Sequence, residues 1–237
     1  MSKVRELRAS LKDVAREIKE LGQGRVGHLR IGVGETTGDQ LLPEAISALL
    51  NDAPRVTLKV ITSDNDLMLP ALRDGQLDLV VNYLPAALPE GLVQERLYNE
   101  DMVVCTAANH RLAGLKRVTL EDLTQERWAS TESVLAGPEW LRRAFEDRGL
   151  PAPRVAVESR AARVSLQSLS TSDLLGFTAR SVYERGAQLF RLTELPIREL
   201  AWKRPVGVIH RNDAYLPPAA RRLIETMRRL AQTVPAN

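Results

Sequence analysis

Residues 28–52 read HLRIGVGETTGDQLLPEAISALLND, and this stretch decides the fold class. Its first part, HLRIGVG at 28–34, has the apolar content of a buried strand. From Asp39 to Asp52 the apolar residues recur at helical spacing. One side of this predicted helix therefore carries Leu41, Leu42, Ile46, Leu49 and Leu50. A buried strand that leads through a short loop into an amphipathic helix is the first half of a βαβ unit.

The same alternation continues toward the C-terminus. We expect TLKVITS at 57–63 to be a strand, DLMLPALRDG at 66–75 a helix and LDLVVNY at 77–83 a third strand. Short connections between such elements imply a parallel sheet with both faces covered. The segment PAALPEG at 85–91 then breaks the pattern with two prolines and a glycine.

A second set of alternating elements follows this break. The expected strands are DMVVCTA at 101–107, RWAST at 127–131, RVAVES at 154–159, LLGFTA at 174–179 and RPVGVIHR at 204–211. The expected helices are LEDL at 120–123, GPEWLRRAFEDRG at 137–149, ARVSLQSLSTS at 162–172 and PPAARRLIETMRRLAQ at 217–232. Two open α/β units in tandem predict a cleft between them. Ligands of such sheets bind outside the carboxyl ends of the strands.

The N-terminal segment has a different period. Its apolar residues are spaced alternately three and four apart: Val4, Leu7, Leu11, Val14, Ile18 and Leu21. Gly22 and Gly24 end the predicted helix. Such a helix could lie on its own domain, but the narrow stripe favours pairing with a helix of another chain.

Composition limits the classes of function. The chain has 237 residues, one cysteine (Cys105) and a formal net charge of +3, which is too small to indicate nucleic-acid binding by itself. Aromatic residues make up only 4%, which disfavours single-strand stacking platforms. No signal peptide or long apolar run is found, so we expect a cytoplasmic protein that does not contact membranes.

The ordered set of segments resembles the LysR-type transcriptional regulators over nearly the whole chain. The segments are HLRIGVGETTGDQLLPEAISAL, LPALRDGQLDLVV, YNEDMVVCTAANHRLA, VTLEDLTQERW, RRAFEDRGLPAPRV and RPVGVIHRNDAYLPPAARRLIETMR. The heptad segment is similar to the family's linker helix, which pairs two subunits. Only Met1–Lys3 precede it, so we expect the family's DNA-reading domain to be absent from this chain.

The resemblance implies an α/β fold of two Rossmann-like subdomains with a central cleft, joined by two crossover strands. This is the type 2 periplasmic-binding-protein fold. The expected domains are a linker and dimerisation helix at 1–24, subdomain I at 28–98 and 212–232, and subdomain II at 99–211. The implied partners are a small-molecule effector and a second copy of the chain, with a tetramer possible at full length. Promoter DNA and RNA polymerase are expected as partners only of the full-length protein.

The resemblance also implies which residues hold the effector. All of them follow or end predicted strands: Thr36, Thr37, Ser63, Asn65, Tyr83, Ser130, Thr131, Phe177 and Thr178. Thr36 and Thr37 precede a helix, where backbone N–H groups suit an oxyanion, although N-capping would also favour threonine. Tyr83 stands where aromatic-acid sensors of the family carry an arginine. This departure weakens the case for a benzoate-like or muconate-like ligand, although an anion could still bind through backbone donors at the helix start. Phe177 is equally compatible with core packing.

Other interpretations have less support. Gly32, Gly34 and Gly38 imitate a dinucleotide-binding fingerprint, but the last spacing is one residue too long for an NAD-type enzyme. The three histidines have no metal spacing with Cys105, and no nucleophile elbow is present, so we expect neither cofactor nor catalysis. A solute-binding protein would share the fold, but the heptad and the missing export signal disfavour it.

Overall fold

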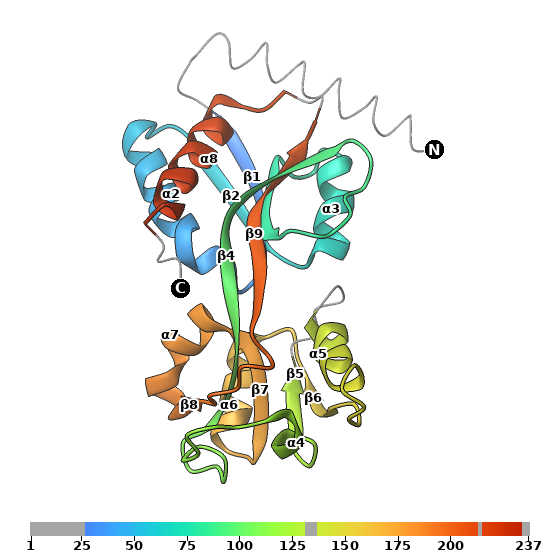
Figure 1. Cartoon of the computed structure of the whole chain (residues 1–237). Coiled ribbons are helices and arrows are strands. Elements are labelled where there is room, and N and C mark those ends of the chain that lie inside the picture. The colour runs from blue at the N-terminus through green and yellow to red at the C-terminus, as the bar shows by residue number, and fades with distance from the viewer. Residues whose placement is uncertain (1–26, 131–136, 213–214, 234–237) are drawn as a thin grey trace. The chain divides into compact units, whose positions relative to one another are not determined.

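The computed structural model describes residues 27–130, 137–212 and 215–233. They form two compact α/β units (Figure 1). The first unit runs to Asn99 and resumes at Pro205, and the second comprises Glu100–Arg204. The second boundary falls earlier than the expected 211/212, because Val206, Val208 and Ile209 pack into the cores of the first unit. The linker helix expected at 1–24 lies outside the described residues, and the central cleft stays a prediction.

The first unit is built on strands from three parts of the chain. They are β1 (His28–Val33), β2 (Thr57–Thr62), β3 (Leu79–Tyr83), the start of β4 (Leu92–Ala107) and most of β9 (Trp202–Arg211). The strand order is β2-β1-β3-β9-β4. β1 is parallel to both β2 and β3, as the short connections predicted, and β9 is antiparallel to β3.

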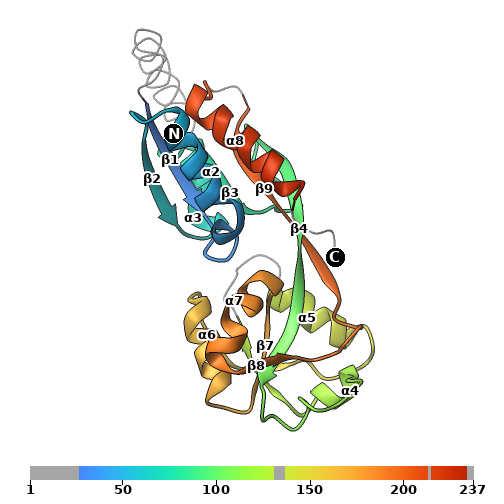
Figure 2. The ribbon, with the colours of Figure 1, turned by 90° about the vertical axis from the view of Figure 1, so that its left-hand side faces the viewer.

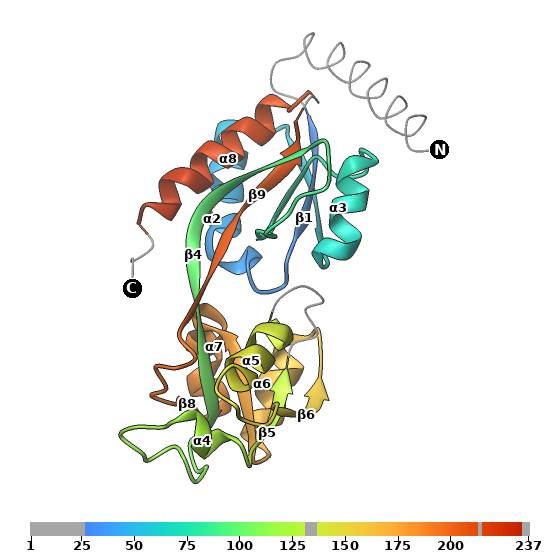
Figure 3. The same cartoon turned by 45° about the vertical axis from the view of Figure 1, so that its right-hand side comes forward.

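Helices cover both faces of this sheet, as Figure 3 shows. On one face, α2 (Gly38–Asp52) and α8 (Pro218–Ala231) pack on β1 and β3 through leucine and methionine side chains. On the other face, α3 (Asn65–Arg73) places Met68 and Leu72 against Val80. Gly32 lets α3 approach, since a Cβ atom there would lie 2.7 Å from the Met68 sulfur.

The second unit has the strand order β4-β7-β5-β6. Its strands are the end of β4, β5 (Arg127–Ser130), β6 (Arg154–Glu158), β7 (Leu174–Ala179) and β8 (Leu192–Glu194), which pairs with β4. Its helices are α4 (Leu120–Leu123), α5 (Gly137–Glu146), α6 (Ala162–Ser170) and α7 (Arg180–Phe190). Figure 2 shows α6 and α7 on one side of the strands and α5 on the other.

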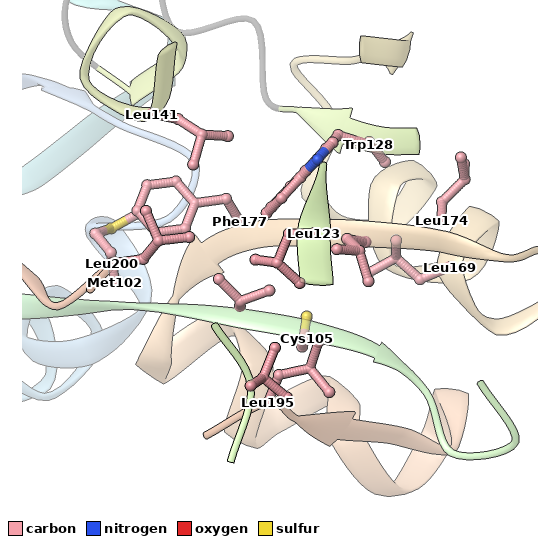
Figure 4. Packing of buried hydrophobic residues seen from close by; sticks show 14 of the residues in the cluster. Met102, Cys105, Leu123, Trp128, Leu141, Leu169, Leu174, Phe177, Leu195 and Leu200 are labelled. Atoms are coloured by element: carbon pink, nitrogen blue, oxygen red, sulfur yellow. The ribbon is translucent and has the colours of Figure 1, made fainter. Parts of the chain in front are cut away.

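Alternate residues of β7 serve the two faces of this second sheet. Gly176 lies under Leu169 of α6, because a Cβ atom there would be 2.5 Å from the leucine side chain. Phe177 points to the opposite face, where Figure 4 shows its ring beside Met102 and Leu200, with Leu141 of α5 close by. Residues of β7 therefore contact helices on both faces of the sheet.

Candidate functional site

The first unit gathers polar residues where its parallel strands end. β1, β2 and β3 run in the same direction, so Val33, Thr62 and Tyr83 finish at one edge of the sheet. Beside this edge α2 and α3 begin, at Gly38 and Asn65. In open α/β sheets this carboxyl edge is where ligands bind.

Asn82, which the sequence analysis missed, connects the residues at this edge through hydrogen bonds. Its side chain is buried, its Oδ1 accepts from the Tyr83 backbone N–H at 2.8 Å, and its Nδ2 donates to Asn65 Oδ1 at 2.9 Å. Asn65 Nδ2 in turn donates to the Tyr83 carbonyl at 2.9 Å. A Cβ atom at Gly34 would lie 2.2 Å from Asn82 Oδ1, so glycine permits this close approach. These bonds hold the ends of β1 and β3 and the start of α3 in one arrangement.

Two hydroxyl groups meet at the same edge. Thr36 Oγ1 donates to the Tyr83 hydroxyl at 3.4 Å, and both side chains are half-buried. Thr36 lies one residue before Thr37, which directly precedes α2. The structure thus brings together two of the expected ligand-binding residues, from positions far apart in the sequence.

Thr37 is turned inward. Its side chain is buried, and its hydroxyl lies 3.3 Å from the carbonyl oxygens of both Gly34 and Val81, to either of which it can donate. It makes no side-chain capping bond to α2, so the capping alternative is not seen. Thr37 therefore fixes the loop that presents Thr36.

Ser63 and Asn65 lie next to each other at the end of β2. The Ser63 N–H donates to the Val33 carbonyl at 3.0 Å, and its side chain is half-buried. Asn65 is the first residue of α3 rather than a loop residue, and it is bonded to Asn82 and Tyr83 as described. Asn65 thus holds the Tyr83 backbone in place, and Ser63 joins the end of β2 to that of β1.

In the second unit, three expected site residues lie near the carboxyl ends of β5 and β7. Ser130 ends β5 and is buried, and its carbonyl accepts from the Ser159 N–H at 3.0 Å. Phe177 and Thr178 are buried near the end of β7 and, as neighbours in a strand, face opposite sides of the sheet. Thr131 lies outside the described residues.

Aromatic rings collect at this same edge, and two of them were not expected. Trp140 of α5 stacks on Trp202 of β9, with ring centroids 4.7 Å apart and planes 4° apart. Phe177 lies parallel to Trp140 at 5.5 Å. The guanidinium of Arg204 lies 5.0 Å from the Trp202 ring centroid. Residues so distant in the chain give no periodic sequence signal, which is why the sequence analysis did not find them.

A buried carboxylate lies at the start of α7. Glu100 Oε1 accepts from the Ser181 backbone N–H at 3.0 Å. Burial raises the pKa of the Glu100 carboxyl above its ordinary value, and the bonds from Ser181 oppose that shift. Arg180, the residue before Ser181, donates to both oxygens of Glu194 at 2.9 and 2.8 Å. Glu100 thus occupies the helix start that would otherwise present its amides to an anion.

The described residues show no arrangement for metal binding, since no group of three or more His, Cys, Asp or Glu side chains among them could hold an ion. Burial raises the pKa of the Cys105 thiol to about 12, which keeps it protonated and unreactive. His110 lies 3.3 Å from Glu126 and accepts from the Leu112 N–H, as a local brace of its turn. No helix in the described part of the chain is long and apolar enough to cross a membrane.

Solved structures of similar fold include two domains bound to small molecules. The regulatory domain of Synechocystis PCC6803 CcmR, in complex with 2-PG, has a TM-score of 0.77 at 18% identity and covers 89% of this chain and 100% of that one. The effector-binding domain of QuiR, in complex with shikimate, has a TM-score of 0.77 at 15% identity, with coverage of 88% and 99%. These likenesses confirm the predicted fold class of two α/β subdomains.

Sequence relatives point to the same family. The HTH-type transcriptional regulator GbpR of Azospirillum brasilense is 22% identical over 97% of this chain and 68% of its own length. The regulator GalR of Pseudomonas putida is 29% identical over 86% of this chain, which spans 51% of that protein. A family model described as the LysR substrate binding domain matches residues 22–232. The chain therefore belongs to the LysR substrate-binding-domain family.

Proposed function

We propose that this chain is the effector-sensing part of a LysR-type transcription regulator and that it binds a small polar organic molecule. The observation that carries the proposal is the buried Asn82–Asn65 network, which presents the Thr36 and Tyr83 hydroxyls at the carboxyl edge of the first sheet. Side chains that are held in place by hydrogen bonds among neighbouring residues keep one geometry, and a binding site needs this pre-organisation. The family match supports the same conclusion.

Two groups in the first unit would make the direct contacts. The Thr36 and Tyr83 hydroxyls can each donate or accept one hydrogen bond, and the start of α2 adds backbone N–H groups. Thr37, Ser63 and Asn65 would hold these groups in place. In the second unit, Ser130, Thr131, Phe177 and Thr178 are the proposed contacts, with Phe177 offering an apolar ring.

Comparison with ligand-bound neighbours supports a small-molecule ligand. CcmR, QuiR and BenM have domains of this fold in complex with 2-PG, shikimate and benzoate, respectively. These ligands differ in shape and share small size and polar groups. We infer that the same edge of this chain takes a ligand of similar size.

We further propose that two copies of the chain associate head to tail. Both edge strands leave apolar side chains exposed, Val60 and Ile61 on β2 and Val155 on β6, and α6 in the same unit as β6 exposes Val164. An exposed edge strand can pair with another chain. Opposite charges are available to pair, because α2 exposes Glu44 and Asp52 whereas β6 and α6 expose Arg154 and Arg163. A two-fold axis would place the β2 and α2 surface of each copy against the β6 and α6 surface of the other, so the same contact forms twice.

A regulator explains the chain better than an enzyme. Relatives across most of the chain are named transcriptional regulators. In the complete protein, ligand binding would change the geometry of the dimer and so its action on promoter DNA and RNA polymerase, in the cytoplasm. Such coupling requires the ligand to bind one conformation more tightly than the other.

A thermal-shift screen of the purified chain tests the proposal. Sugars, aromatic acids and short dicarboxylates are each added at millimolar concentration, and a ligand of the native state raises the unfolding temperature with its concentration. NAD and NADP are included, because stabilisation by them alone would favour the dinucleotide enzyme. We expect stabilisation by at least one small organic molecule, and the complete absence of any such shift would contradict the proposal.

A further inference from the structure

Three aromatic rings in the second unit form one stack, which is here called the aromatic stack: Trp140 of α5, Phe177 of β7 and Trp202 of β9. The centroid separations are 4.7 Å for Trp140–Trp202, 5.5 Å for Trp140–Phe177 and 6.2 Å for Phe177–Trp202. The planes of the three rings differ by only 4° to 9°. Aromatic pairs in ordinary cores adopt edge-to-face as well as stacked arrangements, whereas all three of these rings are parallel to one another.

The separations show that the stack has two layers. Rings in face-to-face contact lie about 3.5 Å apart, so three layers would separate the outer rings by about 7 Å. Every observed separation is shorter than that. Trp140 has the two shorter separations, so it lies across both Phe177 and Trp202 and forms a layer by itself. One face of its indole is used by the stack, and neither of the other two rings covers the opposite face.

The stack lies at the ligand-binding edge of the second unit. Ala129 of β5 is level with Gly176 of β7 in the parallel pairing, so Phe177 is level with Ser130, the last residue of β5. Trp202 precedes Lys203, whose Nζ lies 3.6 Å from Asp101. The residue after Asp101, Met102, pairs with Ala179 at the end of β7. All three rings are therefore near the carboxyl ends of β5 and β7.

The two tryptophans of the stack are less buried than the third tryptophan of the chain. The third tryptophan, Trp128, is completely buried and meets Phe145 edge-to-face, at 88° and 6.2 Å. Trp140 and Trp202 are only half-buried. The chain has three tryptophans and three phenylalanines in all, and three of these six rings lie in this one stack. A chain poor in aromatic residues thus concentrates them at an edge where they are partly accessible.

We propose that the face of Trp140 turned away from Phe177 and Trp202 is a platform on which a planar aromatic ring of the effector stacks. This proposal rests on the proposed function and names the chemical class of the ligand. An indole face alone could also attract a cation. Here the guanidinium of the buried Arg204 lies 5.0 Å from the Trp202 ring centroid, so a cation already contacts the stack. An aromatic ring, such as that of a phenol or a benzoic acid, is the proposed ligand. Because Tyr83 supplies no positive charge, a carboxylate on this ring would be bound by hydroxyl and backbone N–H donors.

Matched pairs of ligands test this platform. The full chain is titrated with benzoate, 4-hydroxybenzoate and 3,4-dihydroxybenzoate, and each is compared with its saturated cyclohexane counterpart of equal charge and similar size. Glucose, galactose, succinate and choline represent the other ligand classes. Binding is measured by calorimetry and by quenching of tryptophan fluorescence, to which the buried Trp128 contributes a nearly constant background. We expect an aromatic acid to bind at least about tenfold more tightly than its saturated counterpart.

Variants of Trp140 locate the effect. Trp140→Leu should weaken binding of the aromatic acid about tenfold, whereas Trp140→Phe should retain most of the affinity because it keeps a ring. Arg143→Ala, on an exposed turn of the same helix, is the control and should leave affinity unchanged. Equal binding of the saturated counterpart, or unchanged affinity in a folded Trp140→Leu protein, would overturn the platform. Binding of only sugars, succinate or choline would also overturn it while leaving the proposed function intact. If no compound of any class binds, both proposals fail.

Discussion

The side-chain amide of Asn82 in β3 donates to Oδ1 of Asn65, the first residue of α3, at 2.9 Å and across 17 residues of sequence. Since Asn65 also bonds to the Tyr83 carbonyl, one buried pair of asparagines positions the residue that carries the candidate ligand-binding hydroxyl. The polar groups of the site are thus held by the fold before any ligand arrives.

Replacement of Asn82 by alanine should destabilise the protein. The change leaves Asn65 Oδ1 and the Tyr83 N–H without their buried partner, which costs roughly 1–3 kcal/mol in the free energy of unfolding. Urea denaturation measures this, with the exposed Asn51→Ala as the control. A loss in Asn82→Ala no larger than in the control would mean that the network does not support the edge.

Gly207→Ala should be more damaging. Gly207 pairs with Asn82, and a Cβ atom there would lie 2.0 Å from the Glu95 carbonyl oxygen, a backbone atom that cannot rotate away. We expect a loss of about 3 kcal/mol or more, or failure to fold. Gly114→Ala is the matched control because nothing lies within 4 Å of its Cβ position. Thermal unfolding of both variants distinguishes the crowded glycine from the open one.

Glu100 should make stability fall as pH rises. Its folded-state pKa lies above the ordinary value, so the folded protein holds this proton more tightly than the unfolded chain does. As pH rises from the ordinary carboxyl pKa through the raised one, the folded state loses relative stability. Glu100→Gln lacks this titrating group. Its free energy of unfolding should therefore rise, relative to that of the unmodified protein, as pH increases over that window.

Glu95 should have the opposite effect on the pH dependence of stability. Its pKa is lowered, chiefly by the hydrogen bond from Arg228, so its contribution to stability is present above the unfolded pKa and is lost as pH falls. In Glu95→Gln the deficit relative to the unmodified protein should shrink on acidification. The same slope for both variants would contradict this account of the two carboxyl groups.

The proposed dimer predicts a selective effect of surface charge. Val164 of α6 is 52% exposed, so Val164→Lys should not unfold the protein but should weaken association by placing a charge in the proposed interface. Leu115, 42% exposed in the loop after β4, is the control, and Leu115→Lys should leave association unchanged. Light scattering at tens of micromolar measures both. Deletion of residues 1–21 should weaken association without abolishing it, and a monomeric unmodified chain would contradict the dimer.

The sequence predicted the alternating elements well because their signals are local. The helix expected at 39–52 is α2 at Gly38–Asp52, and the strand expected at 28–34 is β1 at His28–Val33. The strand expected from 101 begins at Leu92, because charged side chains such as Glu95, which pairs with Arg228, obscure its alternation. The polar helix α7 and the short β8 were not predicted, since few of their residues are buried.

The candidate site was predicted only in part. Thr36, Asn65 and Tyr83 follow strand ends, which is a local property, and the structure brings them together. The supporting role of Asn82 depends on the close approach of Gly34, which directly follows β1. Trp140 and Trp202 meet only through the folding of the second unit, so no periodic pattern marks them.

The most direct test of the central claim is the affinity of a screened ligand for Thr36→Val, measured by isothermal titration calorimetry. If the Thr36 hydroxyl meets the ligand beside Tyr83, its loss should cost roughly 1–3 kcal/mol of binding free energy, and Tyr83→Ala should also weaken binding. Ser47→Ala, exposed on α2, is the control and should bind as the unmodified protein does. Unchanged affinity in both folded variants, Thr36→Val and Tyr83→Ala, would show that the ligand binds elsewhere.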